Sequence, residues 1–111
     1  MISLAPKDRA NAATIPSLPG IYKILNKVNN KFYIGSATNL ATRRNTHFCL
    51  LRQDKHFNKH LQNSYNKYGE DNFIFSVLLI VDKEMLISYE QLLVDNLKPQ
   101  YNKSIICVIL A

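Results

Sequence analysis

Apolar and polar residues alternate in two short segments near the start of the chain. Residues 21–26 and 31–36 are rich in β-branched and aromatic side chains, and the sequence Val-Asn-Asn at 28–30 separates them. Because asparagine is favoured in tight turns and the flanking residues are favoured in strands, this pattern predicts a β-hairpin. Side chains along a strand alternate between its two faces, so Tyr22 and Tyr33 can lie on one face of the hairpin.

A helix is expected directly after the hairpin. Gly35 is expected at the end of the second strand, where the missing side chain lets another backbone or a phosphate come close. Residues 36–39 then offer several candidate N-caps. Arg43 and His47 follow at helical spacing, so a guanidinium and an imidazole should project toward the hairpin, and Cys49 is expected in the core. The stripe that faces the hairpin consists of Leu40, Arg43, His47 and Leu50.

A second helix is predicted for residues 57–68, because apolar residues recur at helical spacing and Gly69 supplies a C-terminal stop signal. Its apolar stripe consists of Phe57, Leu61, Tyr65 and Tyr68. The opposite face carries Lys59, His60, Asn63 and Lys67. That face suits either water or phosphate groups, and the pattern alone is compatible with both.

Residues 73–81 are almost continuously apolar and rich in β-formers, which predicts a buried central strand that pairs with the hairpin. Residues 83–97 are expected to form a third helix, capped by Asp82 and stopped by Pro99. A chain of 111 residues has room for one domain. Together these elements predict an α+β fold in which about three helices flank a three-stranded sheet.

Glu90 is unusual in the third helix because it lies in an apolar stripe. The apolar members of that stripe are Leu86, Leu93 and Leu97. Two interpretations are open. The glutamate can lie at the rim of the core with its carboxylate in water or beside a lysine, or it can act as a metal ligand or a catalytic acid.

The chain is basic, with a formal net charge of +6 and a pI of about 9.4. A small basic protein often binds nucleic acid, but lysine-rich surfaces also serve solubility, and charge alone favours neither interpretation. Cys49 and Cys107 have no paired cysteine or histidine at zinc-binding spacing, so a disulfide framework or a zinc finger is not expected. No apolar run reaches the roughly 20 residues of a membrane helix, and no signal peptide is evident, so a soluble protein is expected.

The residues that can carry chemistry together resemble the motifs of the GIY-YIG nuclease family. The resemblance covers residues 18–103, and its combined spacing is far more specific than either tripeptide. The matching segments are Gly20-Ile21-Tyr22, Tyr33-Ile34-Gly35, Leu40-x-x-Arg43-x-x-x-His47, Asn66-Lys67-Tyr68-Gly69 and Glu90. Within the family, the chain is most similar to homing endonucleases encoded in group I introns of fungal mitochondria and phages, through residues 32–36 and 56–61.

This resemblance implies a small three-stranded antiparallel sheet flanked by helices, and an enzyme that cuts DNA phosphodiester bonds with one divalent metal ion. The catalytic residues that it implies are Tyr22, Tyr33, Arg43, His47 and Glu90. Gly20 and Gly35 belong to the two tripeptide motifs. His56 and Asn102 match positions that are polar and close to the site in homing relatives.

Phosphodiester hydrolysis explains these residue types, because it needs an activated water, stabilised charge on the phosphoryl oxygens and help for the leaving oxygen. Glu90 would bind Mg²⁺ or Mn²⁺, and Arg43 would stabilise the charge on the phosphate. Tyr22 would accept the proton of the water, as is proposed for the family. Because an unperturbed tyrosine has a pKa of about 10, the identity of the base stays open between Tyr22, Tyr33 and His47.

Double-stranded DNA is the expected partner. Contacts to its backbone are expected from basic residues around the hairpin and helices, namely Lys23, Lys31, Arg44, Lys59 and Lys67. Residues 1–17 are expected to form an irregular leader. Homing relatives continue beyond residues 101–102 into a DNA-recognition region, whereas residues 104–111 here form a short apolar tail, so that region is expected to be lacking.

The expected function is therefore a metal-dependent DNA endonuclease of the intron-encoded homing type. A non-cleaving DNA-binding remnant of the same fold and a repair-type nuclease module are the alternatives. The expected location is the mitochondrion if the chain is encoded by a fungal intron, and otherwise the cytoplasm of a phage host or bacterium.

Overall fold

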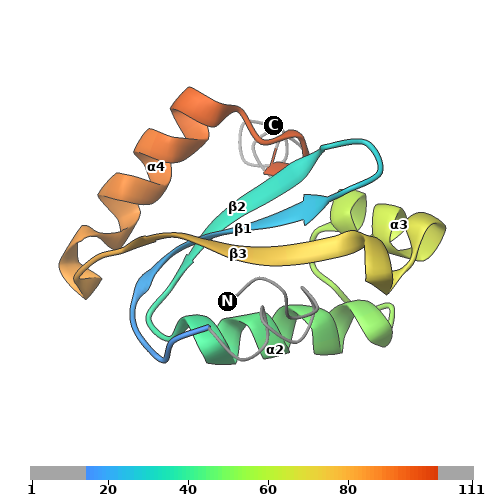
Figure 1. Cartoon of the computed structure of the whole chain (residues 1–111), viewed down its shortest axis with the longest axis horizontal. Helices are drawn as coiled ribbons and strands as arrows, with labels where there is room; N and C mark the ends of the chain where they lie inside the picture. The colour runs from blue at the N-terminus through green and yellow to red at the C-terminus, as the bar shows by residue number, and fades with distance from the viewer. Residues whose placement is uncertain (1–14, 103–111) are drawn as a thin grey trace, which may run out of the picture.

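A three-stranded sheet forms the centre of the fold, and helices lie on both of its faces (Figure 1). A computed structural model of the chain describes residues 15–102. Strands β1 (Gly20–Asn26), β2 (Phe32–Ala37) and β3 (Phe73–Ile80) pair antiparallel in the order β2-β1-β3. This arrangement confirms the predicted α+β fold class with a three-stranded antiparallel sheet flanked by helices.

The helices divide into two groups that cover opposite faces of the sheet. They are α2 (Leu40–Arg52), α3 (Lys59–Tyr68) and α4 (Leu86–Leu97), with the short 3₁₀ helices η1 (Glu70–Asn72), η2 (Lys83–Met85) and η3 (Gln100–Asn102). α2 and α3 pack on the face that carries Tyr22 and Ile24, and α4 packs on the face that carries Ile21 and Ile34. Figure 1 shows α2 and α4 on the two sides of the sheet. No helix within residues 15–102 is long and apolar enough to cross a membrane.

Both tyrosines lie on one face of the hairpin, as predicted. Gly35 lies inside β2, which continues to Ala37, so its predicted place at the end of the strand is wrong. Tyr22 pairs with Gly35, and Ile24 pairs with Tyr33. Directly opposed residues of an antiparallel pair point to the same face, so Tyr22, Ile24 and Tyr33 share the face that α2 and α3 cover. The turn places Asn30 at φ 64°, a left-handed conformation that asparagine tolerates.

β3 is an edge strand, so the prediction of a central strand for residues 73–81 is wrong. β1 is central, because it pairs with β2 on one side and with β3 on the other. The apolar sequence of β3 has a different cause, since helices cover both faces of the sheet. Phe75 packs in the cluster on the α2 and α3 side, and Leu79 packs in the cluster on the α4 side.

The start of α3 differs from the prediction, and its end agrees with it. The helix begins at Lys59, and the side chain of its N-cap Asn58 accepts a hydrogen bond of 3.1 Å from the backbone N–H of Leu61. Phe57 therefore lies outside the helix and is 61% exposed, so it is not part of an apolar stripe. Gly69 ends the helix at φ 89°, as predicted for a C-terminal glycine.

The predicted cap of the third helix is wrong. Residues 83–85 form η2, α4 begins at Leu86, and the Asp82 side chain makes no capping hydrogen bond. The helix ends at Leu97, two residues before Pro99, as predicted. The residue between them, Lys98, has a left-handed conformation with φ 52°, which ends the helix, in place of the extended conformation that proline favours in the residue before it.

Cys49 is exposed, which contradicts its predicted place in the core. It follows the buried His47 by two positions, and two steps turn a helix by about 200°, so the two side chains lie on opposite sides of α2. The beginning of α2 is as predicted, because Asn39 caps it by accepting from the backbone N–H of Thr42 at 3.0 Å. Most of the predicted leader and the predicted tail at 104–111 lie outside the described residues.

Candidate active site

Tyr22 lies at the centre of the site, on the face of the sheet that α2 covers. It is 1% exposed, and its ring stacks on Phe75 with the centroids 4.7 Å apart. Gly35 is opposite Tyr22 on β2, and a Cβ atom there would collide with the Tyr22 hydroxyl. The glycine thus lets the Tyr22 side chain pass over β2. The group that comes close to Gly35 is a tyrosine, where the sequence suggested a backbone or a phosphate.

A chain of hydrogen bonds links Tyr22 to two buried histidines. Oη of Tyr22 lies 2.5 Å from Nε2 of His47, and Nδ1 of His47 lies 2.7 Å from Nε2 of His56. The backbone N–H of Asn58 donates to Nδ1 of His56 at 3.0 Å. The two imidazole rings stack with their centroids 4.9 Å apart. His56, which the sequence placed only near the site, therefore belongs to the same buried chain as Tyr22.

The backbone donor at Asn58 sets the direction of the protons along this chain. An amide N–H can only donate, so Nδ1 of His56 accepts, and the proton of a neutral His56 is on Nε2. That N–H donates to Nδ1 of His47, so the proton of His47 is on Nε2 and is directed at the Tyr22 oxygen. Burial lowers the pKa of His47 to about 3 and the pKa of His56 to about 4, so both rings are neutral at neutral pH.

Burial also keeps the two tyrosines of the site uncharged. It raises the pKa of Tyr22 far above its ordinary value, and the Arg43 guanidinium offsets only part of that rise. Burial, followed by the charge of Glu90, raises the pKa of Tyr33 to about 12. The rings of the two tyrosines are close, with centroids 6.3 Å apart. Arg43 alone therefore does not produce the phenolate that a tyrosine base needs at neutral pH.

Glu90 reaches the site from the other face of the sheet. Oγ of Ser36 donates to Oε1 of Glu90 at 2.5 Å. Ser36 pairs with Ile21, so its side chain lies on the face that α4 covers. Nη1 of Arg43, an exposed residue of α2, donates to the carbonyl oxygen of Ser36 at 3.2 Å. Arg43 and Glu90 therefore both contact Ser36 on β2, and they approach it from different elements.

Asn102 completes the outer edge of β2. Its Oδ1 accepts from the backbone N–H of Ile34, and its Nδ2 donates to the Ile34 carbonyl oxygen, both at 2.8 Å. These two bonds replace those that a neighbouring strand would make. Asn102, which the sequence placed near the site, therefore contacts the backbone of β2 through its amide.

Three further residues of this region were not predicted from the sequence to belong to the site. Ser36 binds Glu90, and Asn58 orients His56. Phe57 stacks on His56 with centroids 4.3 Å apart and covers the histidine on the side of the solvent. An asparagine before a helical pattern is an N-cap signal, and this signal could have located Asn58 and excluded Phe57 from the helix.

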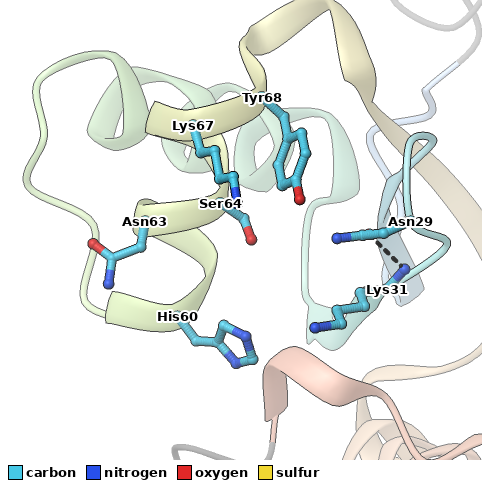
Figure 2. A pocket seen from close by; sticks show the side chains of 7 residues that line it. All are labelled: Asn29, Lys31, His60, Asn63, Ser64, Lys67 and Tyr68. Carbon is cyan, nitrogen blue, oxygen red and sulfur yellow. Dashed lines mark hydrogen bonds between the residues drawn. The ribbon is translucent and has the colours of Figure 1, made fainter.

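Two of the five basic residues predicted to contact DNA lie at one cavity. Lys31 and Lys67 line this cavity, as Figure 2 shows. The other three, Lys23, Arg44 and Lys59, do not line it.

A metal ion in this site would have a single protein carboxylate as its ligand. Residues 15–102 contain no group of three or more His, Cys, Asp or Glu side chains that could hold a metal ion. Glu90 uses Oε1 to accept from Ser36, and its second carboxylate oxygen can serve as a ligand. Mg²⁺ often binds through one or two carboxylates and keeps several waters, whereas Zn²⁺ takes three or four protein ligands. The residues present therefore fit Mg²⁺ or a similar hard cation.

Phenol, imidazole, guanidinium and carboxylate groups that gather around one strand of a small α+β domain are the groups that a phosphodiester hydrolase needs. The family model for the GIY-YIG catalytic domain matches residues 18–103. The chain therefore belongs to the GIY-YIG family, and the matched part is the catalytic domain of that family.

Two of the curated relatives are intron endonucleases, and a third is a UvrABC system protein C of Chlorobium chlorochromatii, 28% identical over 96 residues. The chain is 36% identical over 85 residues to intron-associated endonuclease 1 of Enterobacteria phage T4, an alignment that covers 75% of this chain and 34% of that protein. It is 45% identical over 58 residues to the probable intron-encoded endonuclease 1 of Neurospora crassa, covering 52% of this chain and 18% of that protein. The chain thus matches only a part of the length of each relative.

Two solved structures show the same fold. The catalytic domain of the homing endonuclease I-TevI is similar with a TM-score of 0.70 at 35% identity, over 76% of this chain and 92% of that chain. The N-terminal endonuclease domain of UvrC from Thermotoga maritima, bound to magnesium as its catalytic divalent cation, has a TM-score of 0.54 at 21% identity. That match covers 86% of this chain and 96% of the UvrC chain.

Proposed function

We propose that this chain is a metal-dependent DNA endonuclease of the intron-encoded homing type. The observation that carries the proposal is the buried chain of Tyr22, His47 and His56, whose tyrosine end is close enough to Arg43 and Glu90 for both charges to act on it. The similarity to the intron endonucleases of phage T4 and Neurospora crassa supports the homing type. Double-stranded DNA is the proposed substrate.

Tyr22 is the general base in this proposal. Its oxygen accepts the Nε2–H of His47, so its own hydroxyl proton is directed away from the histidines. A hydrogen-bond donor at the oxygen stabilises the phenolate, so His47 favours the loss of the tyrosine proton. The hydroxyl proton of Tyr22 passes to a solvent water, which leaves a phenolate. The phenolate takes a proton from a second water as the oxygen of that water attacks phosphorus and the P–O3′ bond breaks, and the released 3′ oxygen takes a proton from solvent.

The other two candidates for the base are less suitable. His47 has its proton on the nitrogen that faces Tyr22, and burial lowers its pKa to about 3, so it accepts a further proton poorly. The Nε2–H of His47 donates to Tyr22, so this imidazole stabilises the phenolate of Tyr22 and not that of Tyr33. We assign Tyr33 the role of positioning the water or the phosphate by hydrogen bonding.

Arg43 is proposed to stabilise the negative charge that develops on the phosphate. It is exposed, and its hydrogen bond to the Ser36 carbonyl holds one arm of the guanidinium beside β2. The other N–H groups have the planar geometry that binds two phosphate oxygens at once. A lysine would keep the charge but could not reproduce this geometry.

Glu90 is proposed as the metal ligand. The hydroxyl of Ser36 fixes Oε1, which orients the carboxylate toward β2. A bound Mg²⁺ or Mn²⁺ would neutralise charge on the phosphate and stabilise the leaving 3′ oxygen. The magnesium bound by the UvrC domain, which shares the fold, supports the choice of cation.

Incubation of the purified protein with supercoiled plasmid tests the proposal. With Mg²⁺ we expect nicked and linear DNA, and with EDTA we expect the plasmid to stay supercoiled. Glu90→Gln should abolish cleavage, whereas Glu84→Gln changes an exposed carboxylate of η2 and should leave cleavage intact. If Glu90→Gln cleaves like the wild type, Glu90 is not the ligand. If the wild type binds DNA but never cuts it, the chain is a non-cleaving remnant.

A further inference from the structure

A second polar site lies between α3 and the turn that joins β1 to β2. It is a cavity of about 190 Å³, and Figure 2 shows its lining side chains around one open space. Its lining consists of Asn29, Lys31, His60, Asn63, Ser64, Lys67 and Tyr68. None of these residues belongs to the site around Tyr22. Since a water takes up about 30 Å³ in the liquid, the cavity has room for a phosphate group with some of its waters.

Asn29 presents a hydrogen-bond donor to this cavity. Its Oδ1 accepts from the backbone N–H of Lys31 at 3.0 Å, which fixes the orientation of the amide. The amide nitrogen is therefore the atom that remains for the cavity, and Figure 2 shows it directed into the open space.

Ser64 presents a second donor, for a similar reason. Nδ2 of Asn26 donates to Oη of Tyr101 at 3.2 Å, and Oη of Tyr101 donates to Oγ of Ser64 at 2.9 Å. The serine oxygen is thus an acceptor in this chain, and its own hydrogen is left to donate. Figure 2 shows the Ser64 hydroxyl pointing toward the cavity.

The charged groups at the cavity are cations. Lys31 extends into it from the hairpin turn, and Lys67 lines it from α3. The lining contains no carboxylate. Two ammonium groups and two oriented neutral donors without a compensating acid favour an anion, and phosphate oxygens accept from all of them.

We propose that this cavity binds a phosphate of the DNA backbone away from the bond that is cut. The choice of DNA as the source of the phosphate rests on the proposed function. Lys31 directly precedes β2, and Ser36 lies five residues further along the chain, a distance of about 16 Å for an extended strand. DNA held at Ser36 would carry further phosphates at that distance, since each strand has one phosphate per about 3.4 Å of helix axis. The contact positions the duplex and reads no bases.

Asn29→Asp tests the site with a minimal change. Aspartate keeps an oxygen that accepts from the Lys31 N–H and also suits the turn, but it replaces the donor in the cavity with a negative charge. Asn96→Asp is the matched control, because it makes the same chemical change on the exposed surface of α4. Both variants are made in the Glu90→Gln background, so that binding is measured without cutting.

The first measurement is a salt titration of binding to a duplex. Asn29→Asp should weaken binding about tenfold and lower the slope of log affinity against log salt by about 1, the change expected when one phosphate contact is lost. Asn96→Asp should leave the slope unchanged. Lys67→Gln, on the exposed side of α3, should lower the slope in the same way, and Lys83→Gln on η2 should not. An unchanged slope in both Asn29→Asp and Lys67→Gln would overturn the proposal.

The second measurement separates a DNA phosphate from a free one. Inorganic phosphate is added to the labelled protein, and the backbone amide resonances of residues 29–31 and 64 are followed by NMR. Saturable shifts in the wild type that disappear in Asn29→Asp support an anion site. If phosphate binds there but the DNA slope is unchanged, the ligand is a free phosphate compound and the DNA assignment is wrong. If the slope changes while the wild type cuts no plasmid, the nuclease proposal fails and this site stands.

Discussion

The two halves of the candidate active site differ in how much water reaches them. Tyr22, His47 and His56 are each 1% exposed, and their polar atoms bond to one another along a single line. Arg43 lies on the exposed surface of α2, and Glu90 is partly buried on α4. One half is therefore organised by the fold before any substrate arrives, and the other presents charged groups to solvent.

This difference in exposure predicts which side chains support both the stability of the fold and the chemistry, and which support the chemistry alone. A buried polar group without a partner costs about 1–3 kcal/mol, so every member of the tyrosine and histidine chain supports the stability of the fold as well as the chemistry. Exposed charges contribute little to stability and keep their capacity for a phosphate or a metal ion. Changes in the buried half should lower both stability and rate, and changes in the exposed half should lower the rate alone.

Tyr22→Phe should have the largest effect. Loss of a general base lowers turnover by about 10²–10⁴-fold. The buried Nε2–H of His47 also loses its acceptor, so we expect the free energy of unfolding to fall by about 1–3 kcal/mol. Single-turnover cleavage of plasmid and unfolding in urea measure the two quantities.

Tyr65→Phe is the matched control for this change. Its hydroxyl donates to Oε1 of Glu70 at 2.6 Å, outside the site, so its loss should lower stability and leave the cleavage rate unchanged. Wild-type cleavage by Tyr22→Phe would assign the base to another residue and leave the buried half with a structural role only.

Arg43→Lys should lower the cleavage rate and leave the free energy of unfolding unchanged. Removal of one donor to a developing negative charge costs about 10²–10³-fold in turnover, and lysine cannot replace the planar fork. The midpoint of urea unfolding should not change, because the side chain is exposed. Binding to DNA in the Glu90→Gln background should weaken much less than the rate, since one phosphate contact among several carries little of the affinity.

Arg52→Lys makes the same substitution at an exposed arginine whose Nε pairs with Glu70 at 2.8 Å. It should leave the cleavage rate unchanged. Equal losses in DNA affinity and turnover for Arg43→Lys would place Arg43 among ordinary contacts to the DNA backbone. The exposed half of the site would then bind DNA without a catalytic role for Arg43.

Local rules of the sequence predict the parts of the site that depend on a single element. The period of two along a strand places Tyr22 and Tyr33 on one face of the hairpin, and helical spacing places His47 on the inner side of α2. Both expectations agree with the structure, because neighbours in sequence decide them.

These local rules do not predict contacts between elements that are far apart in the sequence. β3 pairs with β1 at the edge of the sheet, and its apolar sequence is equally compatible with a central strand. Ser36 lies on the opposite face from Tyr22, so the meeting of Ser36 with Glu90 depends on how α4 packs. Asn58 orients His56 through its backbone N–H, an atom that every residue except proline has, and composition cannot reveal it.

A decrease in pH should have the smallest effect, and it acts on the buried half. Burial lowers the pKa of His47 to about 3 and of His56 to about 4, whereas an unfolded histidine has a pKa of about 6.5. Below that value the unfolded chain binds protons that the folded chain does not. The free energy of unfolding therefore has its full value above about pH 6.5. It falls on acidification by up to about 1.4 kcal/mol per pH unit for each of these two histidines.

Urea unfolding between about pH 7.5 and about pH 5.5 measures this loss before most carboxylates titrate. His56→Gln removes one titrating ring, so the dependence on pH should become less steep by the share of that ring. His60, whose pKa burial also lowers, contributes equally in both proteins. Arg43→Lys keeps its charge and should leave the dependence as it is in the wild type. A free energy of unfolding that stays constant over this range would mean that the histidines take up protons in the folded state. The direction of the hydrogen bonds from Asn58 to Tyr22 would then be lost at mildly acidic pH, because a charged His56 can no longer accept at Nδ1.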